Sequence, residues 1–138
     1  LLPRFIEDWI ARPYGCRMSW IDHVSQWAFD RPNVVAVRYG DLLAKPEAVL
    51  SEAIERHTGE EVDPARIAAT VKKFSFENQT QRRRGTEDRE NPKRKGIVGD
   101  WQNHFSREAG EVFDHHAGDL LIRLGYEADR SWVSRIQR

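Results

Sequence analysis

The first apolar positions of the chain recur at helical spacing. Leu2, Phe5, Ile6, Trp9 and Ile10 fall at i, i+3, i+4, i+7 and i+8, which predicts an amphipathic helix with one buried face. The opening residues have no initiator Met and no basic start followed by an apolar block, so they do not resemble a signal peptide. We therefore expect the chain to begin inside a folded element, as a partial domain would.

Four further helices are predicted from the same periodicity and from residues typical of helix ends. Small polar residues favour the N-cap, Pro favours the first helical turn, and Gly favours the position after the last turn. The predicted helices cover residues 20–28 after Ser19, Pro46 to Gly59, Pro64 (after Asp63) to Phe74, and the segment from Ser106 to Gly125.

One short run predicts a β-strand. Residues 34–39 are mostly apolar and β-branched, and they lie between Pro32-Asn33 and Gly40-Asp41. A continuous apolar run of this length is typical of a strand buried on both faces in a parallel sheet. A single strand cannot satisfy its own backbone groups. Either it pairs with chain beyond these residues, or it dimerises through that edge, or the run is not a strand.

Composition and charge limit the classes of protein to consider. The 138 residues are 39% hydrophobic and 32% charged, which is ordinary for one globular domain. Lys and Arg total 22, equal to Asp and Glu, so the whole-chain charge disfavours nucleic acid and anionic membranes as partners. Cys16 is the single cysteine; no intrachain disulfide can form, and we expect a reducing, cytoplasmic location.

The charge is concentrated in residues 77–100, which we interpret as one long loop. Between Arg82 and Lys95 there are seven cationic and three anionic side chains, a local balance of +4. The guanidinium of Arg matches phosphate, and Gly96 would let the backbone approach a ligand closely. An anion site is one interpretation. A solvated charged loop is another, because charge runs usually face water. A third is a non-catalytic module that binds anions or nucleic acid through Arg82–Lys95.

The end of this loop carries a specific motif. Residues 94–105 read R-K-G-I-V-G-D-W-Q-N-H-F and resemble the R-K-G-x-x-G-D-W-K-N-x-F signature of sulfotransferases that use 3′-phosphoadenosine 5′-phosphosulfate (PAPS). Eight signature positions match within these twelve residues. Other segments resemble the family in the same order over roughly residues 5–126: W-I-D-H-V at 20–24, Y-G-D-L at 39–42, S-F-E at 75–77, F-D at 113–114 and L-G-Y at 124–126.

The resemblance implies a fold class and a cofactor. The parent fold would be α/β, a three-layer sheet like that of P-loop kinases. Residues 1–138 would form a single partial domain from its C-terminal part, mostly α with one parallel-type strand at about 34–39. The loop 77–100 would bind the nucleotide of PAPS. The family's pattern assigns the 3′-phosphate to Arg94, Lys95 and Gly96, and the border of the adenine to Tyr39, Ser75 and Phe76.

The resemblance also indicates what this sequence lacks. The family's T-Y-P-K-S-G-T-T phosphate loop, its R-x-P-x-D-x-x-x-S segment and its catalytic His have no counterpart here. We therefore assign no catalytic residue and expect the 138-residue chain to bind the cofactor with hardly any turnover. The resemblance implies sulfuryl transfer to a hydroxyl or amine of a small-molecule acceptor, and either a homodimer or pairing with an N-terminal half.

A metal site is not predicted. His115 and His116 are adjacent, and neighbouring side chains on a helix point about 100° apart, so they do not share one ion easily. His57 and His104 lack ligand spacing to a cysteine or carboxylate pair. We expect neither a metal cofactor nor a nucleic-acid or membrane partner.

Overall fold

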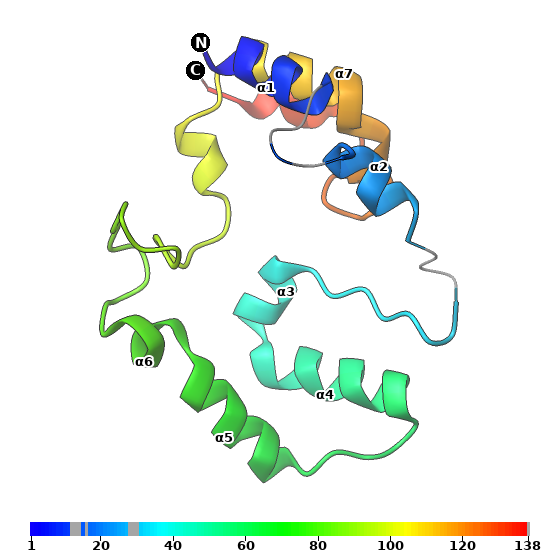
Figure 1. Ribbon diagram of the computed structural model, residues 1–138, viewed down its shortest axis with the longest axis vertical. Coiled ribbons are helices and arrows are strands. Elements are labelled where there is room, and N and C mark those ends of the chain that lie inside the picture. The colour runs from blue at the N-terminus through cyan, green and yellow to red at the C-terminus, as the bar shows by residue number, and fades with distance from the viewer. Residues whose placement is uncertain (12–14, 16, 28–30, 138) are drawn as a thin grey trace. The chain divides into compact units, whose positions relative to one another are not determined.

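The computed structural model describes residues 1–137 except 12–14, 16 and 28–30. Cys16 and the end of the predicted helix at residue 28 lie outside the described residues. The described chain divides into two compact units, residues 1–28 with 100–138 and residues 29–99. Within the described residues the regular elements are helices, without a strand (Figure 1). None of the helices described is both long and apolar enough to cross a membrane.

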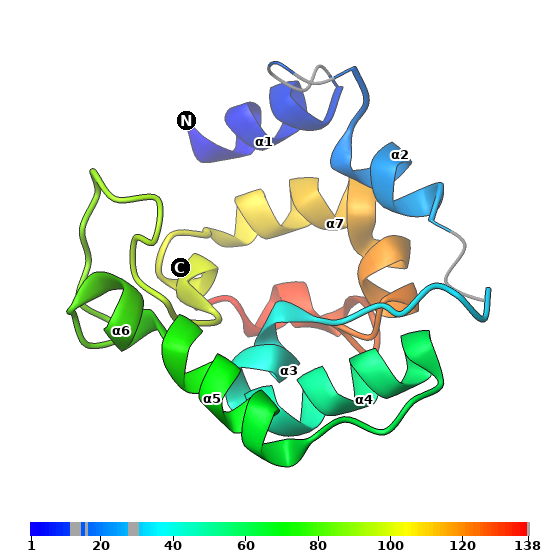
Figure 2. The same cartoon turned by 60° about the horizontal axis from the view of Figure 1, so that its bottom comes forward.

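The first unit is built around its longest helix, α7. Helices α1 and α2 and the 3-10 helix η2 contact α7, and α1 runs along α7 in both views (Figures 1 and 2). The predicted caps are confirmed, because Ser19 Oγ accepts from the Asp22 amide at 3.1 Å and Ser106 Oγ from the Ala109 amide at 3.2 Å. The elements are α1 (Leu2–Ala11), α2 (Trp20–Ser25), η1 (Asp100–Asn103), α7 (Arg107–Arg123) and η2 (Arg130–Arg135).

The core of this unit is small and partly aromatic. Ile6 of α1 and Leu120 of α7 are buried, as are two alanines of α7. Trp132 of η2 is also buried and makes edge contacts with the rings of Trp101 and Phe113, at centroid distances of 5.7 and 6.5 Å. Such edge-to-face pairs stabilise beyond their buried area, so the aromatic residues hold η1 and η2 against α7.

An ionic network joins α7 to η2. Asp114 accepts from Arg130 Nη1 at 2.7 Å and from the Trp132 indole at 2.8 Å, and Arg130 also donates to Asp119 at 2.7 Å. The hydrogen bond to Asp114 raises the pKa of Arg130 above its ordinary value. Hydrogen bonds from Ser131 lower the pKa of Asp129, which caps η2.

In its described residues, the second unit has four helices and a long irregular segment. Helices α4 and α5 pack side by side, and α3 contacts α4 (Figure 1). The predicted ends are confirmed: α4 starts at Pro46 and is followed by Gly59, and Asp63 caps α5 by accepting from the Ala65 amide at 2.9 Å. Among the described apolar side chains of residues 31–99, only Ile67 is buried, with 6% of its surface exposed. The helices are α3 (Tyr39–Ala44), α4 (Pro46–Thr58), α5 (Pro64–Phe74) and α6 (Phe76–Thr80).

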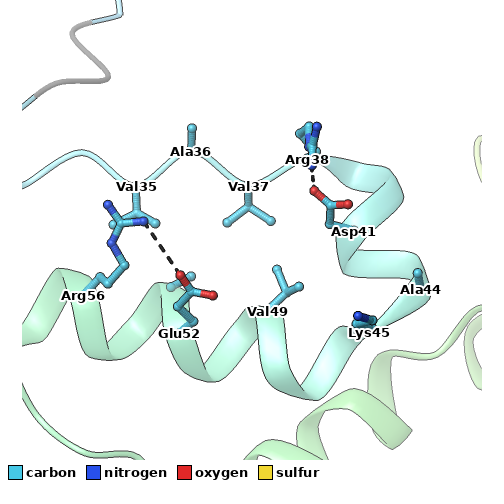
Figure 3. A pocket seen from close by; sticks show the side chains of 11 residues that line it. Val35, Ala36, Val37, Arg38, Asp41, Ala44, Lys45, Val49, Glu52 and Arg56 are labelled. Carbon is cyan, nitrogen blue, oxygen red and sulfur yellow. Dashed lines mark hydrogen bonds and ion pairs between the residues drawn. The ribbon is translucent and has the colours of Figure 1, made fainter. Parts of the chain in front are cut away.

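The strand predicted at 34–39 is not formed within the described chain. Residues 34–38 are not in a regular element, and Tyr39 begins α3. Val35 and Val37 point toward α4 while Ala36 points away (Figure 3), which is the alternation of an extended chain. The backbone of Val35–Val37 makes no hydrogen bond to another described segment. Without a neighbouring strand there is no ladder, so the sequence pattern produces extended chain and no sheet.

Candidate nucleotide-binding site

A cavity of about 520 Å³ lies within the second unit. Its walls come from α3, α4, α5 and α6 and from the chain at residues 92–96. Five of the six residues that the signature assigns to the cofactor line this cavity: Tyr39, Ser75, Phe76, Arg94 and Gly96. Lys95 does not line it. The fold thus brings together residues that are up to 57 positions apart in the sequence.

The cavity is largely apolar on its helical side. Leu42 and Leu43 of α3 and Val71 of α5 line it together with three aromatic residues, Tyr39, Phe74 and Phe76. Tyr39 and Phe74 are 56% and 63% exposed, and the Lys73 ammonium lies over the Phe74 ring, 5.4 Å from its centroid. Exposed aromatic faces suit a planar base, since stacking on a π-surface is favourable for any nucleobase.

Gly96 and Phe76 approach each other more closely than a side chain at residue 96 would allow. A Cβ built on Gly96 would lie 2.7 Å from two carbons of the Phe76 ring, and the backbone φ is +65°. Both features require glycine. Within the described chain the Gly96 amide donates no hydrogen bond. Gly96 therefore lines the cavity in close contact with the Phe76 ring, and its backbone N–H has no acceptor among the described residues.

The predicted loop 77–100 is shorter and more ordered than the sequence suggests. Helix α6 extends to Thr80, so the irregular chain begins at residue 81. Two backbone hydrogen bonds fold it back on itself, from the Gly85 amide to the Lys95 carbonyl at 2.8 Å and from the Asp88 amide to the Arg94 carbonyl at 3.0 Å. The chain carrying Arg94 and Gly96 is therefore held along residues 85–88.

Three cations line the cavity, and their partners differ. Arg84 lies 3.4 Å from a carboxylate oxygen of Glu77 and Arg94 lies 3.5 Å from one of Glu87. Lys93 Nζ donates to the neutral amide of Gln79 at 3.1 Å. Exposed ion pairs of this kind contribute only about 0–1 kcal/mol, so an anionic ligand can compete for these side chains.

The residues present fit a phosphorylated aromatic ligand. Guanidinium and ammonium donors suit phosphate oxygens, and Gly96 adds an amide that no other described group uses.

Some of the residues that line the cavity could not be recognised from the sequence. Arg84 is one member of a cationic run and is not distinguished from its neighbours, and no pattern marks the leucines of α3 or Val71 as walls. The helical pattern of α3 was hidden because its first residue completes the β-branched run at 34–39.

A second hollow, of about 440 Å³, lies between residues 35–38 and α4. Its charged groups are already paired: Arg38 Nε donates to Asp41 at 2.6 Å, and Arg56 lies 3.9 Å from Glu52 (Figure 3). It lacks an aromatic side chain among its lining residues. It is therefore a weaker candidate for a nucleotide than the first cavity.

Metal-ligating side chains do not cluster in the described part of the chain. No group of three or more His, Cys, Asp or Glu side chains suited to one ion occurs there. The rings of His115 and His116 stand at 78° to each other. His23 accepts a hydrogen bond from the Trp27 indole at 3.3 Å.

Comparison with known proteins assigns the chain to a family. A family model described as the sulfotransferase domain matches residues 6–125. "Sulfotransferase 1E1" of Cavia porcellus is 31% identical over 131 residues, covering 83% of this chain and 42% of that relative. "Sulfotransferase 1E1" of Homo sapiens is 32% identical over 127 residues with the same coverage. "Sulfotransferase 1C2" of Homo sapiens is 31% identical over 108 residues, 70% of this chain and 36% of the relative. No solved structure matches significantly.

The protein belongs to the sulfotransferase domain family. The resemblance drawn from residues 94–105 is thereby confirmed. The chain spans less than half the length of these curated relatives. Membership implies the α/β, P-loop-kinase-like fold for the complete domain, whereas the described residues of this chain are helical or irregular.

Proposed function

We propose that this chain is the part of a PAPS-dependent sulfotransferase that holds the 3′-phosphate and the adenine of the cofactor. The complete enzyme would transfer a sulfuryl group to a hydroxyl or amine of a small-molecule acceptor. One observation carries the proposal: five of the six residues assigned by the signature line a single cavity. They come from α3, α6 and the chain before Gly99, so their convergence is a property of the fold rather than of sequence spacing.

The phosphate end of the cavity is assigned to Arg94 and Gly96. Arg94 supplies a planar cationic donor, and Gly96 supplies a backbone N–H. Charge-assisted hydrogen bonds are roughly twice as strong as neutral ones, so this pair would dominate the recognition of a 3′-phosphate. Lys95 follows directly in the chain and adds positive charge nearby. Lys93, which lines the cavity, is a further phosphate donor in this proposal.

The adenine end is assigned to Tyr39, Ser75 and Phe76. Tyr39 and Phe76 would cover the faces of the base, and the Ser75 hydroxyl would bond to its edge. Phe74 stands where the family commonly has Thr, and it lines the same cavity, so here stacking replaces a polar contact. Bound PAPS supplies the sulfuryl group, and the residues named here bind and orient its nucleotide.

Transfer itself needs groups that these 138 residues do not contain. No segment resembles the Lys-bearing phosphate loop of the family, and no His is assigned as base. In-line transfer depends mainly on positioning and charge stabilisation. We therefore expect this chain alone to bind the nucleotide without measurable turnover. A small-molecule acceptor, a cytoplasmic location, and homodimerisation or pairing with an N-terminal half stay predictions.

The test is calorimetric binding of 3′-phosphoadenosine 5′-phosphate, with 5′-AMP as the ligand that lacks only the 3′-phosphate. We expect tighter binding of the bisphosphate, and a loss of that preference in Arg94→Ala. Arg89→Ala is the matched control, since Arg89 is in the same segment, is 82% exposed and does not line the cavity. Equal affinity of the wild-type chain for both ligands would contradict the proposal.

The rival hypothesis is a module that binds anions or nucleic acid through Arg82–Lys95. The cations of this run do not all face solvent: Arg82 donates to backbone carbonyls and its side chain is only 18% exposed, whereas Arg83, Arg84 and Arg89 are exposed. A phosphate-binding stripe would instead present them together to solvent. Tight, steeply salt-dependent binding of generic oligonucleotides would favour this rival.

A further inference from the structure

The side chain of Arg82 is directed into the backbone of the nucleotide-binding segment. Its Nη1 donates to the carbonyls of Thr86 at 2.9 Å and Arg94 at 3.0 Å, and its Nη2 donates to the carbonyl of Lys93 at 2.7 Å. Asp88 lies 3.9 Å from the same guanidinium. The side chain is only 18% exposed, although it begins a run of three arginines.

Arg82 is also stacked near the ring that Gly96 contacts. Its Cζ lies 5.3 Å from the centroid of Phe76, and Phe76 is the ring that would collide with a Cβ at residue 96. Arg82 itself does not line the cavity. It therefore lies behind the wall formed by Phe76 and residues 93–96 and cannot be counted among the ligand contacts.

The geometry of these contacts suits arginine and no other side chain. A guanidinium offers five N–H donors in one rigid plane, so it can reach several carbonyls at once, whereas an ammonium is a compact donor on a flexible stem. Within the described chain Arg82 is the donor to the Lys93 carbonyl, and that carbonyl has no other. Removing the guanidinium would free the backbone on the N-terminal side of Arg94.

We propose that Arg82 is a positioning residue for the phosphate end of the cavity. By fixing the carbonyls of Lys93 and Arg94 on one side, it directs the Arg94 side chain and the Gly96 amide toward one ligand phosphate. This role rests on the proposed function. It adds a residue that touches no part of the ligand and yet determines the preference for a 3′-phosphate.

The test compares Arg82→Lys and Arg82→Gln with Arg83→Gln in the full 138-residue chain. Arg83 is the matched control, because it is the next cation, it is exposed, and its side chain neither lines the cavity nor pairs with a described group. Calorimetry with 3′-phosphoadenosine 5′-phosphate and 5′-AMP gives the preference for the 3′-phosphate. We expect the ratio of the two affinities to fall about tenfold in both Arg82 variants, which corresponds to one charge-assisted hydrogen bond. The affinity for 5′-AMP should stay unchanged.

Arg82→Lys separates position from charge. If it keeps the wild-type preference, charge alone suffices and the proposal is overturned. The proposal is also overturned if Arg83→Gln loses as much as Arg82→Gln, or if the affinities for both ligands fall together, as a general loss of folding would cause.

A second measurement does not depend on the ligand. Hydrogen exchange at the amides of Gly85 and Asp88, which bond to Lys95 and Arg94, should be about tenfold faster in Arg82→Lys, while the α5 amides are unchanged. Unchanged exchange at both amides overturns the positioning role. If the wild-type chain shows no preference for the bisphosphate, the proposed function fails, and the exchange rates still decide whether Arg82 orders this segment.

Discussion

Residue 96 is a glycine, and the absence of a side chain lets the chain at residue 96 lie against the Phe76 ring. Arg94 and Lys95 are recognisable in the sequence as cations that could meet a phosphate, but charge alone does not bring a backbone amide to the cavity wall. The positive φ of Gly96 and its contact with the Phe76 ring do so. The glycine of the signature is therefore a packing requirement, in addition to the ligand-binding role proposed for it.

Gly96→Ala should weaken the second unit and its binding of 3′-phosphoadenosine 5′-phosphate. A left-handed backbone costs an alanine about 1–2 kcal/mol, and overpacking against Phe76 adds about 1–3 kcal/mol. We expect a lower urea midpoint by far-ultraviolet circular dichroism, and an affinity at least about tenfold lower by calorimetry.

Gly85→Ala is the matched control for this substitution. Gly85 has φ +89°, but a Cβ at this residue would have no neighbouring atom within 4 Å, so the variant carries the backbone cost without the collision. It should lose less stability than Gly96→Ala by the overpacking contribution. Equal losses in the two variants would show that the contact between Gly96 and Phe76 is unimportant.

At the level of elements, five helices were predicted from their apolar stripes and end signals, whereas α3 and α6 were not. Helices of five and six residues, such as α6 and α3, are too short to show a period of 3.6 residues. They are nevertheless the elements that carry Phe76 and Tyr39 to the cavity. Their helical state depends on contacts with α5 and α4, which local sequence does not encode.

A substitution in helix α7 is predicted to have opposite effects on stability through packing and through helix propensity. Gly118→Ala should destabilise the first unit, although alanine favours a helix by about 1 kcal/mol over glycine. Its Cβ would lie 2.7 Å from Arg130 Nη1 and would disturb the bonds that join Arg130 and Trp132 to Asp114. We expect a net loss of about 1–2 kcal/mol, measured by the tryptophan fluorescence of urea unfolding.

Gly40→Ala is the counterpart in the second unit. A Cβ on Gly40 would meet Val98 at 3.7 Å, an ordinary contact, so α3 should gain up to about 1 kcal/mol. Circular dichroism would record this gain. Gly118→Ala and Gly40→Ala are expected to change the free energy of unfolding in opposite directions. If both raised it, helix propensity alone would explain the two results; if both lowered it, backbone or packing strain alone would. In either case the hydrogen bonds around Asp114 would not be needed to explain the effect of Gly118→Ala.

For the whole molecule, the important feature is the division into two units. The signature crosses it, because residues 94–99 belong to the second unit and residues 100–105 to the first. All five tryptophans belong to the first unit, whereas the cavity lies entirely in the second. Tryptophan fluorescence therefore reports on one unit, and a ligand of the cavity acts on the other.

This separation makes a prediction for unfolding in the presence of ligand. At about 100 times its Kd, 3′-phosphoadenosine 5′-phosphate should stabilise the second unit by about 2.7 kcal/mol. The part of the circular dichroism change that comes from α3–α6 should move to higher urea, while the part from α1, α2 and α7 and the fluorescence transition stay in place. Equal shifts of both signals would contradict this and indicate that the two units unfold as one cooperative body. 5′-AMP at the same concentration is the control.

The sequence by itself determined the family, five of the helical segments and the list of candidate cofactor residues. These depend on local features: periodic apolar positions, capping residues, and a twelve-residue motif that is recognised from its residue types alone. Only the tertiary structure decided that Tyr39 starts a helix, that residues 34–38 have no strand partner within the described chain, and that Arg82 faces inward while Arg83 is exposed. Those outcomes depend on which backbone groups come into contact across the fold. Three consecutive arginines cannot be distinguished by residue type, and only their tertiary contacts make one buried and another exposed.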